Sequence, residues 1–311
     1  MMQTKHLMQF AAVASAGNIS EAAKRLNIAQ PALSQSILTF EESLGIKLFN
    51  RHRRGVELTE AGEELLTWAI SILDQIETAK ETIRQIDESP SGKVTAAFPA
   101  SVAHAIVEPL CRQVLEKHPR IFLHIEEGLT GNIGRWLFSG RVDIMIDFDV
   151  GLSGDLRSEP LISEDLYLIG ANLGSNEDIP FADLVDYPLL LPGPEHAMSK
   201  AIARFEREQG ILLTRVAMEM AVHPMLRNVI AGNCYSISPW SLIHDRVASG
   251  TLFARRVVNP TLSREASIVT HRSRPETPAV KLIREAIRKT VIQSHTEDVW
   301  RGRLLLEDID G

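Results

Sequence analysis

The chain has 311 residues, of which 44% are hydrophobic and 23% charged. This balance is typical of a globular protein of two or three domains and excludes collagen-like, disordered and disulfide-scaffold proteins. No run of about 18 uncharged apolar residues occurs, and the N-terminus lacks a long apolar core before a small-residue cleavage site. We therefore expect a cytoplasmic protein that has no membrane partner.

The net charge of −7 is unevenly distributed along the chain. Residues 1–58 carry seven Lys or Arg and four Glu, a net charge of +3, whereas residues 59–88 carry a net charge of −6. The basic N-terminal segment is therefore a separate domain, and the overall charge does not exclude a nucleic-acid partner. The two cysteines lie far apart without a CxxC or Cys/His cluster, so we expect neither a metal site nor a cofactor.

The N-terminal segment shows three short helical patterns. The first has apolar residues at helical spacing and stops at Gly17-Asn18. Ser20 is predicted to cap a second helix over residues 21–26. After a tight connection, Pro31 stands in the first turn of a third helix, where a missing N–H is tolerated.

The third helix has one apolar and one mostly polar side. The apolar stripe predicts packing inside the domain and comprises Leu33, Ile37, Phe40 and Leu44. The opposite side carries Pro31, Ser34, Gln35 and Leu38. Two helices around a short turn indicate a helix-turn-helix, although any αα-hairpin has the same pattern.

The segment after this helix favours a nucleic-acid-binding winged variant. Residues 48–58 read as two short extended pieces around a basic tip that contains Arg51, Arg53 and Arg54. Arginines at such a tip suit contacts with phosphates, while the alternative is a solvated turn.

An ordered set of residues over positions 5–66 resembles the LysR-type transcriptional regulators. The motifs are Leu7-x-x-Phe10-x-x-Val13, Ser20-Glu21-Ala22-Ala23-x-x-Leu26, Gln30-Pro31-Ala32-Leu33-Ser34 and Glu41-x-x-Leu44-Gly45-x-x-Leu48-Phe49-x-Arg51-x-x-Arg54-x-Val56-x-Leu58-Thr59-x-Ala61-Gly62. The resemblance implies that Arg51 and Arg54 lie near the DNA backbone and minor groove. It also implies that the following residues face the major groove: Gln30, Pro31, Ser34 and Gln35. The chain departs from the usual family pattern at Gln35 and Ser36.

Residues 59–88 are predicted to form one long linker helix that Thr59 caps. An apolar seam with alternating spacings of four and three runs along it, comprising Leu65, Ala69, Ile72, Ile76, Ala79, Ile83 and Ile86. Such a seam favours a partner helix and hence a dimer, although a helix packed on its own domain is the alternative. Two heads at fixed spacing predict an inverted-repeat operator, and the resemblance adds a tetramer built as a dimer of dimers.

After a hinge at residues 89–92, strand-like and helix-like patterns alternate, which indicates parallel βαβ units. The LysR resemblance implies a two-lobed α/β effector domain of the periplasmic-binding-protein type. Its first lobe would comprise residues 93–163 and 268–294 and its second lobe residues 164–267. Residues 295–311 form a C-terminal tail whose role the sequence leaves open.

Ligands of such sheets bind beyond the carboxyl ends of strands, where helix N-termini attract anions. Ser101 and Thr130 follow the first two predicted strands of this domain and match family cleft positions, and His223 holds a comparable place in the second lobe. An organic anion bound by these three side chains is the predicted effector. The alternative for each hydroxyl is a plain helix cap or loop contact.

Three short motifs further resemble the nitrogen-assimilation-control branch of the family. They are Leu191-Pro192-Gly193-Pro194-x-His196, Val258-Asn259-Pro260-x-Leu262-x-Arg264 and Arg274-Pro275-x-x-Pro278-Ala279. That resemblance leaves open a regulator that acts without a small effector, and RNA polymerase is a further candidate partner.

Two other function classes stay open as alternatives. An enzyme with a DNA-binding head is disfavoured because no GxSxG, GxxxxGK[ST], GxGxxG or HExxH motif occurs. A purely structural DNA-binding protein would not need the large domain.

Overall fold

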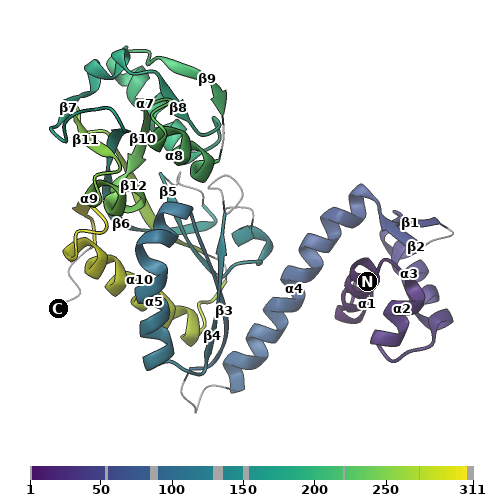
Figure 1. Ribbon diagram of the computed structural model, residues 1–311. Coiled ribbons are helices and arrows are strands. Elements are labelled where there is room, and N and C mark those ends of the chain that lie inside the picture. The colour runs from purple at the N-terminus through teal and green to yellow at the C-terminus, as the bar shows by residue number, and fades with distance from the viewer. Residues whose placement is uncertain are drawn as a thin grey trace. The chain divides into compact units, whose positions relative to one another are not determined.

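The computed structural model describes residues 2–52, 55–84, 90–128, 136–149, 154–219, 221–272 and 274–306 (Figure 1). The chain forms two compact units, the first built mainly from residues 1–89 and the second mainly from residues 90–311. We call the first unit the head with its linker helix, and the second the C-terminal unit.

The head contains three helices, a hairpin and the linker helix. The helices are α1 (Thr4–Ala16), α2 (Ile19–Arg25) and α3 (Gln30–Leu44), the antiparallel hairpin strands are β1 (Phe49–His52) and β2 (Gly55–Leu58), and the linker helix is α4 (Glu60–Arg84). Three residues of the predicted stripe of α3 form the centre of the head's core, since Leu33, Ile37 and Phe40 are buried. The fourth, Leu44, is 40% exposed at the end of the helix, so the prediction that it packs inside the domain is wrong. The winged helix-turn-helix architecture predicted from the sequence is confirmed.

Helix caps and one close approach between two backbone segments fix the connections between the elements of the head. Gly17 ends α1 in the left-handed conformation, as predicted, and Thr59 caps α4 by accepting the backbone N–H of Gly62 at 3.1 Å. The prediction that Ser20 caps α2 is wrong, because the side chain of Asn18 accepts the N–H groups of Ser20 and Glu21. Gly55 lies so close to the α1–α2 turn that a Cβ atom would stand 2.3 Å from the carbonyl oxygen of Gly17.

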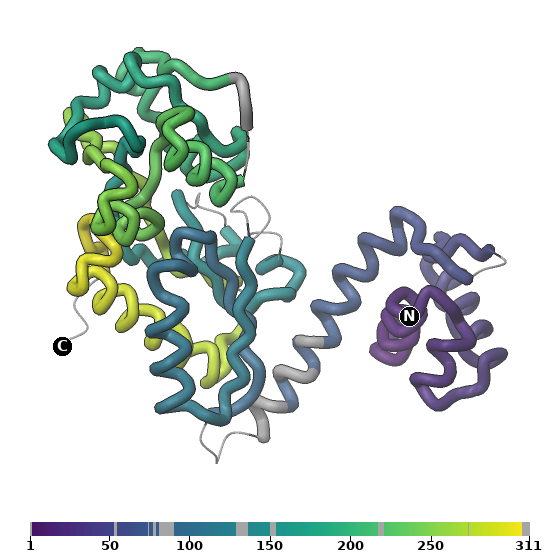
Figure 2. Tube along the Cα trace, in the orientation of Figure 1, coloured from purple at the N-terminus to yellow at the C-terminus, as the bar shows by residue number. Residues whose placement is uncertain are grey.

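The first lobe of the C-terminal unit contains a sheet against which two long helices pack. Strands β3 (Gly92–Phe98), β4 (Ile121–Glu127) and β5 (Ile144–Phe148) are parallel, as predicted. Helix α5 (Ala100–Lys117) follows β3, and α10 (Pro278–Thr296) packs beside it (Figure 2). Ser294 Oγ on α10 donates to the carbonyl of Ala105 at 3.0 Å. Their apolar faces and the sheet enclose one continuous core.

One long strand, β6 (Leu156–Gly170), belongs to both lobes. Its first part pairs antiparallel with β12 (Ser263–His271), and its last part pairs antiparallel with β10 (Ser236–Pro239) and β11 (Phe253–Val258). Parallel βαβ units therefore describe only part of this unit, because the chain returns between lobes along antiparallel strands.

The second lobe is completed by short strands and helices around its own core. It contains β7 (Ile179–Pro180), η1 (Phe181–Asp186), β8 (Leu189–Leu191), α7 (Ala197–Gln209), β9 (Arg215–Glu219), α8 (Val222–Ile230), η2 (Trp240–Leu242) and α9 (His244–Ala248). Strands β8 and β9 pair in parallel.

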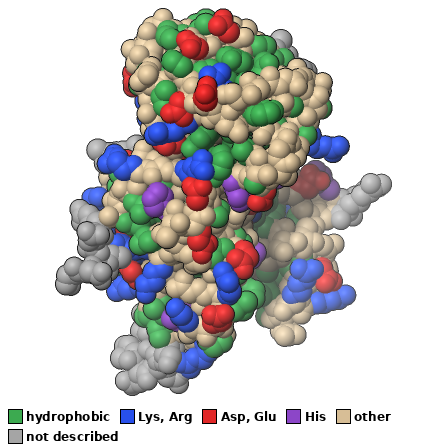
Figure 3. All heavy atoms as spheres, turned by 60° about the vertical axis from the view of Figure 1, so that its left-hand side comes forward, with side chains coloured by type: hydrophobic (Ala, Val, Ile, Leu, Met, Phe, Trp, Pro, Cys, Tyr) green, Lys and Arg blue, Asp and Glu red, His purple; other side chains and the backbone are tan. Residues whose placement is uncertain are grey.

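The segment beyond α10 returns to the strand shared by the lobes. Strand β13 (Gly302–Leu304) pairs antiparallel with β6, so that Gly302 lies opposite Glu164 and Leu304 opposite Ile162. On the face drawn in Figure 3, acidic and basic side chains lie interspersed with exposed hydrophobic ones. None of the helices among the described residues combines the length and apolarity needed to cross a membrane.

Candidate functional site

The outward face of α3 is polar and uncharged. Gln30, Pro31 and Gln35 are exposed, and Ser34 is half-buried. Ser36, one of the two departures from the family pattern, does not belong to this face, because its hydroxyl donates to Oε1 of the buried Gln9 on α1. Ser36 therefore ties α3 to α1 within the head.

The hairpin and α3 form one surface. Arg51 Nη1 lies 3.4 Å from Ser34 Oγ and donates to it, so the wing reaches over the polar face of the helix. Glu41, buried near the end of α3, accepts the backbone N–H groups of Leu48 and Phe49 at 2.7 and 3.0 Å and ties the hairpin to the helix. The other two predicted wing residues, Arg53 and Arg54, lie outside the described residues.

The predicted seam of α4 divides into two parts. Ala69 is fully buried in the head's own core, and Leu65 and Ile72 pack against that core. Beyond them, Ile76 is half-buried and Ala79 exposed. Two further apolar side chains of α4 are exposed, Trp68 by 54% and Ile70 by 43%. Two seam residues remain: Ile86 lies outside the described residues, and so does the side chain of Ile83.

A pocket of about 250 Å³ lies between the lobes of the C-terminal unit. Ser101 from α5 and His223 from α8 both line it, so the structure brings together two of the three predicted effector contacts. Thr130, the third, lies outside the described residues. We call this pocket the cleft.

A buried ion pair that sequence reasoning missed lies at the cleft. Arg264 lines the cleft, is 2% exposed, and donates from Nε to Glu164 Oε1 at 2.5 Å and from Nη2 to Ser101 Oγ at 3.1 Å. Glu164 also accepts from Trp300 Nε1 at 2.7 Å. Burial raises the pKa of Glu164, and the hydrogen bonds from Arg264 and Trp300 oppose that rise.

Nothing in the local sequence marks this ion pair, because its members lie 100 residues apart. The one available signal is that Arg264 belongs to the motif Val258-Asn259-Pro260-x-Leu262-x-Arg264, which carries part of the resemblance to the nitrogen-assimilation-control branch.

Two titratable groups near Arg264 have shifted pKa values. Burial, with a smaller contribution from Arg264, lowers the pKa of His196 to about 4. Its Nδ1 accepts the N–H of Met198 at 3.2 Å and caps α7, so the neutral ring carries its proton on Nε2. Burial raises the pKa of Asp147 to about 6, against the hydrogen bond from the Phe148 N–H and the charge of Arg264.

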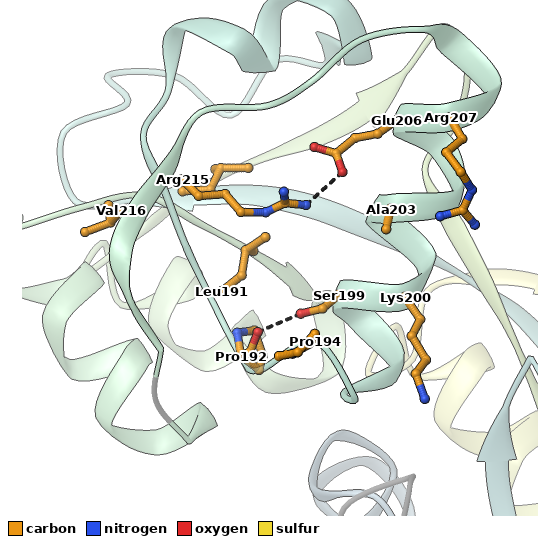
Figure 4. A pocket seen from close by; sticks show the side chains of 11 residues that line it. Leu191, Pro192, Pro194, Ser199, Lys200, Ala203, Glu206, Arg207, Arg215 and Val216 are labelled. Atoms are coloured by element: carbon orange, nitrogen blue, oxygen red, sulfur yellow. Dashed lines mark hydrogen bonds and ion pairs between the residues drawn. The ribbon is translucent and has the colours of Figure 1, made fainter.

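A larger hollow of about 640 Å³ lies within the second lobe (Figure 4). The carboxylate of Glu206 crosses it to Arg215 at 2.7 Å and also accepts the N–H of Leu213, and Ser199 donates to the carbonyl of Pro192. These polar groups bond to one another, so we favour the cleft as the ligand site. No group of three His, Cys, Asp or Glu within the described ranges is arranged to hold a metal ion.

Comparison with known proteins decides the family. Residues 87–291 match the LysR substrate-binding domain and residues 4–63 match the bacterial regulatory helix-turn-helix of the lysR family. The chain belongs to the LysR family. It is therefore a LysR-type transcriptional regulator with a DNA-binding head and an effector-binding domain.

Other LysR-type regulators are similar over nearly the whole chain. The nitrogen assimilation regulatory protein nac of Klebsiella aerogenes is 24% identical over 96% of this chain and 98% of its own. A full-length OxyR variant from Pseudomonas aeruginosa shares the fold with a TM-score of 0.71 at 23% identity, over 93% and 98% of the two chains. CbnR in complex with its target DNA has a TM-score of 0.67 at 22% identity, over 93% of this chain and 100% of that one.

Proposed function

We propose that this regulator binds inverted-repeat promoter DNA as an oligomer and responds to a small organic anion in the cleft. The observation that carries the DNA part is the joint surface of α3 and the wing, where Arg51 reaches Ser34. Exposed amide and hydroxyl groups on α3 suit base edges, since Gln pairs with adenine and Ser can donate or accept. Arg51 suits the phosphates, which supply affinity without sequence preference.

The oligomer rests on the later part of α4. The head's own core uses the first apolar residues of this helix, so the residues left for a partner helix are those near Ile76 and Ala79. Trp68, two turns earlier on the same side of the helix, is also exposed. A helix that exposes such side chains gains stability when a second copy covers them. Two heads joined in this way meet two half-sites, and pairing of dimers gives the tetramer.

The effector part rests on the composition of the cleft. The N-termini of α5 and α8 both contribute to its lining, together with Ser101, His223 and the buried Arg264. Helix N-termini and guanidinium groups favour negative charge. Thr130 completes the proposed contact set.

The test compares three duplexes at one salt concentration in a gel-shift titration: the upstream region of the gene, the same region with one half-site scrambled, and random sequence. We expect the intact region to bind tightest and the scrambled half-site to lose the cooperative step. Equal affinity for all three duplexes contradicts sequence-specific binding to an inverted repeat. Operator binding that no organic anion alters supports a regulator that acts without an effector.

A further inference from the structure

Arg264 lines the cleft and holds one buried hydrogen-bond donor without a partner among the described residues. Its Nε and Nη2 are taken by Glu164 and Ser101, and its guanidinium carbon lies 3.5 Å from the ring centroid of Phe148. Nη1 is buried and has no hydrogen-bond partner among the residues that the structure describes. A buried N–H group without an acceptor is costly, especially on a charged group, and such a group calls for a ligand.

The other polar groups of the cleft are also mostly donors. His196 lines it with a neutral ring that carries its proton on Nε2. The first-turn N–H groups of α5 and α8 add positive potential, since both helices begin at the cleft. Of the described lining residues, Glu127 alone bears a carboxylate, and its side chain is exposed. A ligand that only accepts hydrogen bonds and carries negative charge matches this set.

The remaining lining is apolar and comes largely from the second lobe. It includes Met198, Val222, Met225 and Leu242, all of them buried. The volume of about 250 Å³ holds a compact molecule, and ligands gain affinity by burying apolar surface against such side chains. A second charged group on the ligand would have to lose its hydration against this apolar wall.

We propose that the cleft binds a small monocarboxylate with a compact apolar body, and that Arg264 binds its carboxylate through Nη1 once a small side-chain shift exposes this atom to the cleft. This inference rests on the proposed effector function and names its ligand class. Ser101, held by Arg264 Nη2, is oriented beside the carboxylate and can donate its own hydroxyl proton to it. The apolar body lies against the second lobe.

The C-terminal segment positions Arg264. Trp300, which is 1% exposed, donates to the second oxygen of Glu164 while the first oxygen accepts from Arg264. Strand β13 follows at once and places Gly302 so close to β6 that a Cβ atom would stand 2.7 Å from the Cα of Glu164. Glu164 and Trp300 are therefore positioning residues that act through the guanidinium, which gives the tail beyond α10 a role.

The test measures binding to the full-length protein by isothermal titration calorimetry with isovalerate, benzoate, the neutral isostere isovaleramide and the dianion succinate. We expect both monocarboxylates to bind at least about tenfold more tightly than the amide or succinate, the factor that one charged hydrogen bond supplies. Binding of succinate in preference to the monocarboxylates, or binding of none of the four probes, overturns the proposal.

Two variants test Arg264. Because removal of one charge from a buried pair can unfold the protein, Arg264→Gln is combined with Glu164→Gln. We expect this double variant to lose at least about tenfold in isovalerate affinity while Arg207→Gln, which removes an exposed arginine that lines the second-lobe hollow and not the cleft, stays within about twofold of the wild type. Unchanged affinity in a double variant that still shows a cooperative melting transition refutes the role of Arg264.

A third variant tests the positioning role. Trp300→Phe keeps the buried ring and removes the N–H that holds Glu164. We expect the ratio of isovalerate to isovaleramide affinity to fall about three- to tenfold, whereas a merely structural role would weaken both ligands equally. Operator binding by each preparation is measured in parallel. Loss of operator specificity in the wild type refutes the proposed function, while retained specificity without carboxylate selectivity refutes only this inference.

Discussion

The shifted pKa of His196 predicts a contribution to the stability of the effector-binding domain that is lost in acid. Burial lowers this pKa from 6.5 to about 4. Between these two values, His196 is protonated in the unfolded chain and neutral in the folded domain. Stability therefore falls as the pH decreases from 6.5 towards 4. At about 1.4 kcal/mol per pKa unit, the loss at pH 5 is about 2 kcal/mol and approaches about 3 kcal/mol at pH 4.

Asp147 acts in the opposite direction over part of the same range. Its pKa rises from 3.8 to about 6 on folding, so the folded domain takes up a proton between pH 6 and 4 that the unfolded chain does not. This proton uptake stabilises the folded domain by about 1.4 kcal/mol at pH 5. The wild-type profile is thus shallow, and each contribution becomes visible only when the other group is removed.

His196→Asn isolates the histidine, because Asn is a strong N-cap residue that can still accept the N–H of Met198 at the start of α7. As the pH is lowered from 7.5 to 5, the free energy of unfolding of this variant should rise by about 2 kcal/mol relative to that of the wild type. Asp147→Asn is the matched control and should lose about 1.4 kcal/mol over the same range.

Urea unfolding followed by tryptophan fluorescence measures these differences. A Trp68→Phe background removes the tryptophan of α4, so that the signal comes from Trp136, Trp240 and Trp300 of the effector-binding domain. A difference between His196→Asn and the wild type that stays constant with pH would refute the linkage, since a lost packing contact carries no pH dependence.

The remaining predictions concern the head and linker helix. Arg51→Gln should weaken binding to every DNA sequence and reduce the slope of log affinity against log salt by about one, measured in gel-shift titrations at several salt concentrations. Gln30→Ala should instead change the preferred sequence at one base position at similar salt dependence, as seen by selection from randomised duplexes. Ile76→Glu should lower the oligomeric state in sedimentation velocity, and an unchanged oligomer with full operator affinity would exclude this part of α4 as the dimer contact. Phe40→Ala should destabilise the head by about 3 to 5 kcal/mol and abolish operator binding, while calorimetric binding of isovalerate is retained.

Local signals in the sequence were sufficient to predict the head. Gly17 ends a helix because a left-handed residue is needed there, and the stripe of Leu33, Ile37 and Phe40 follows the period of a helix. The misplaced cap of α2 shows the limit of such signals. Asn18 and Ser20 are both good caps, and only the backbone geometry decides that Asn18 accepts the free N–H groups.

The cleft could be predicted only in part. Ser101 and His223 each stand at the start of a helix that follows a strand pattern, and this local rule found them. Arg264, Glu164 and Trp300 obey no local rule, because two strands and the C-terminal tail, from distant parts of the sequence, bring them together. Hydrophobic periodicity shows which side of a helix or strand is apolar. It does not show which buried charge has a partner, so it cannot predict an ion pair of this kind.

The position of this network on β6 would connect the proposed ligand binding to the junction between the lobes. Glu164 stands where β6 passes from its pairing with β12 to its pairing with β10 and β11, and β13 adds its hydrogen bonds at the same point. We therefore expect a change in the angle between the lobes to alter the backbone beside Glu164 and, through its carboxylate, the position of Arg264. A ligand that binds Arg264 as proposed would favour the lobe arrangement that keeps this ion pair intact, because it would have a differential affinity for that state of the domain.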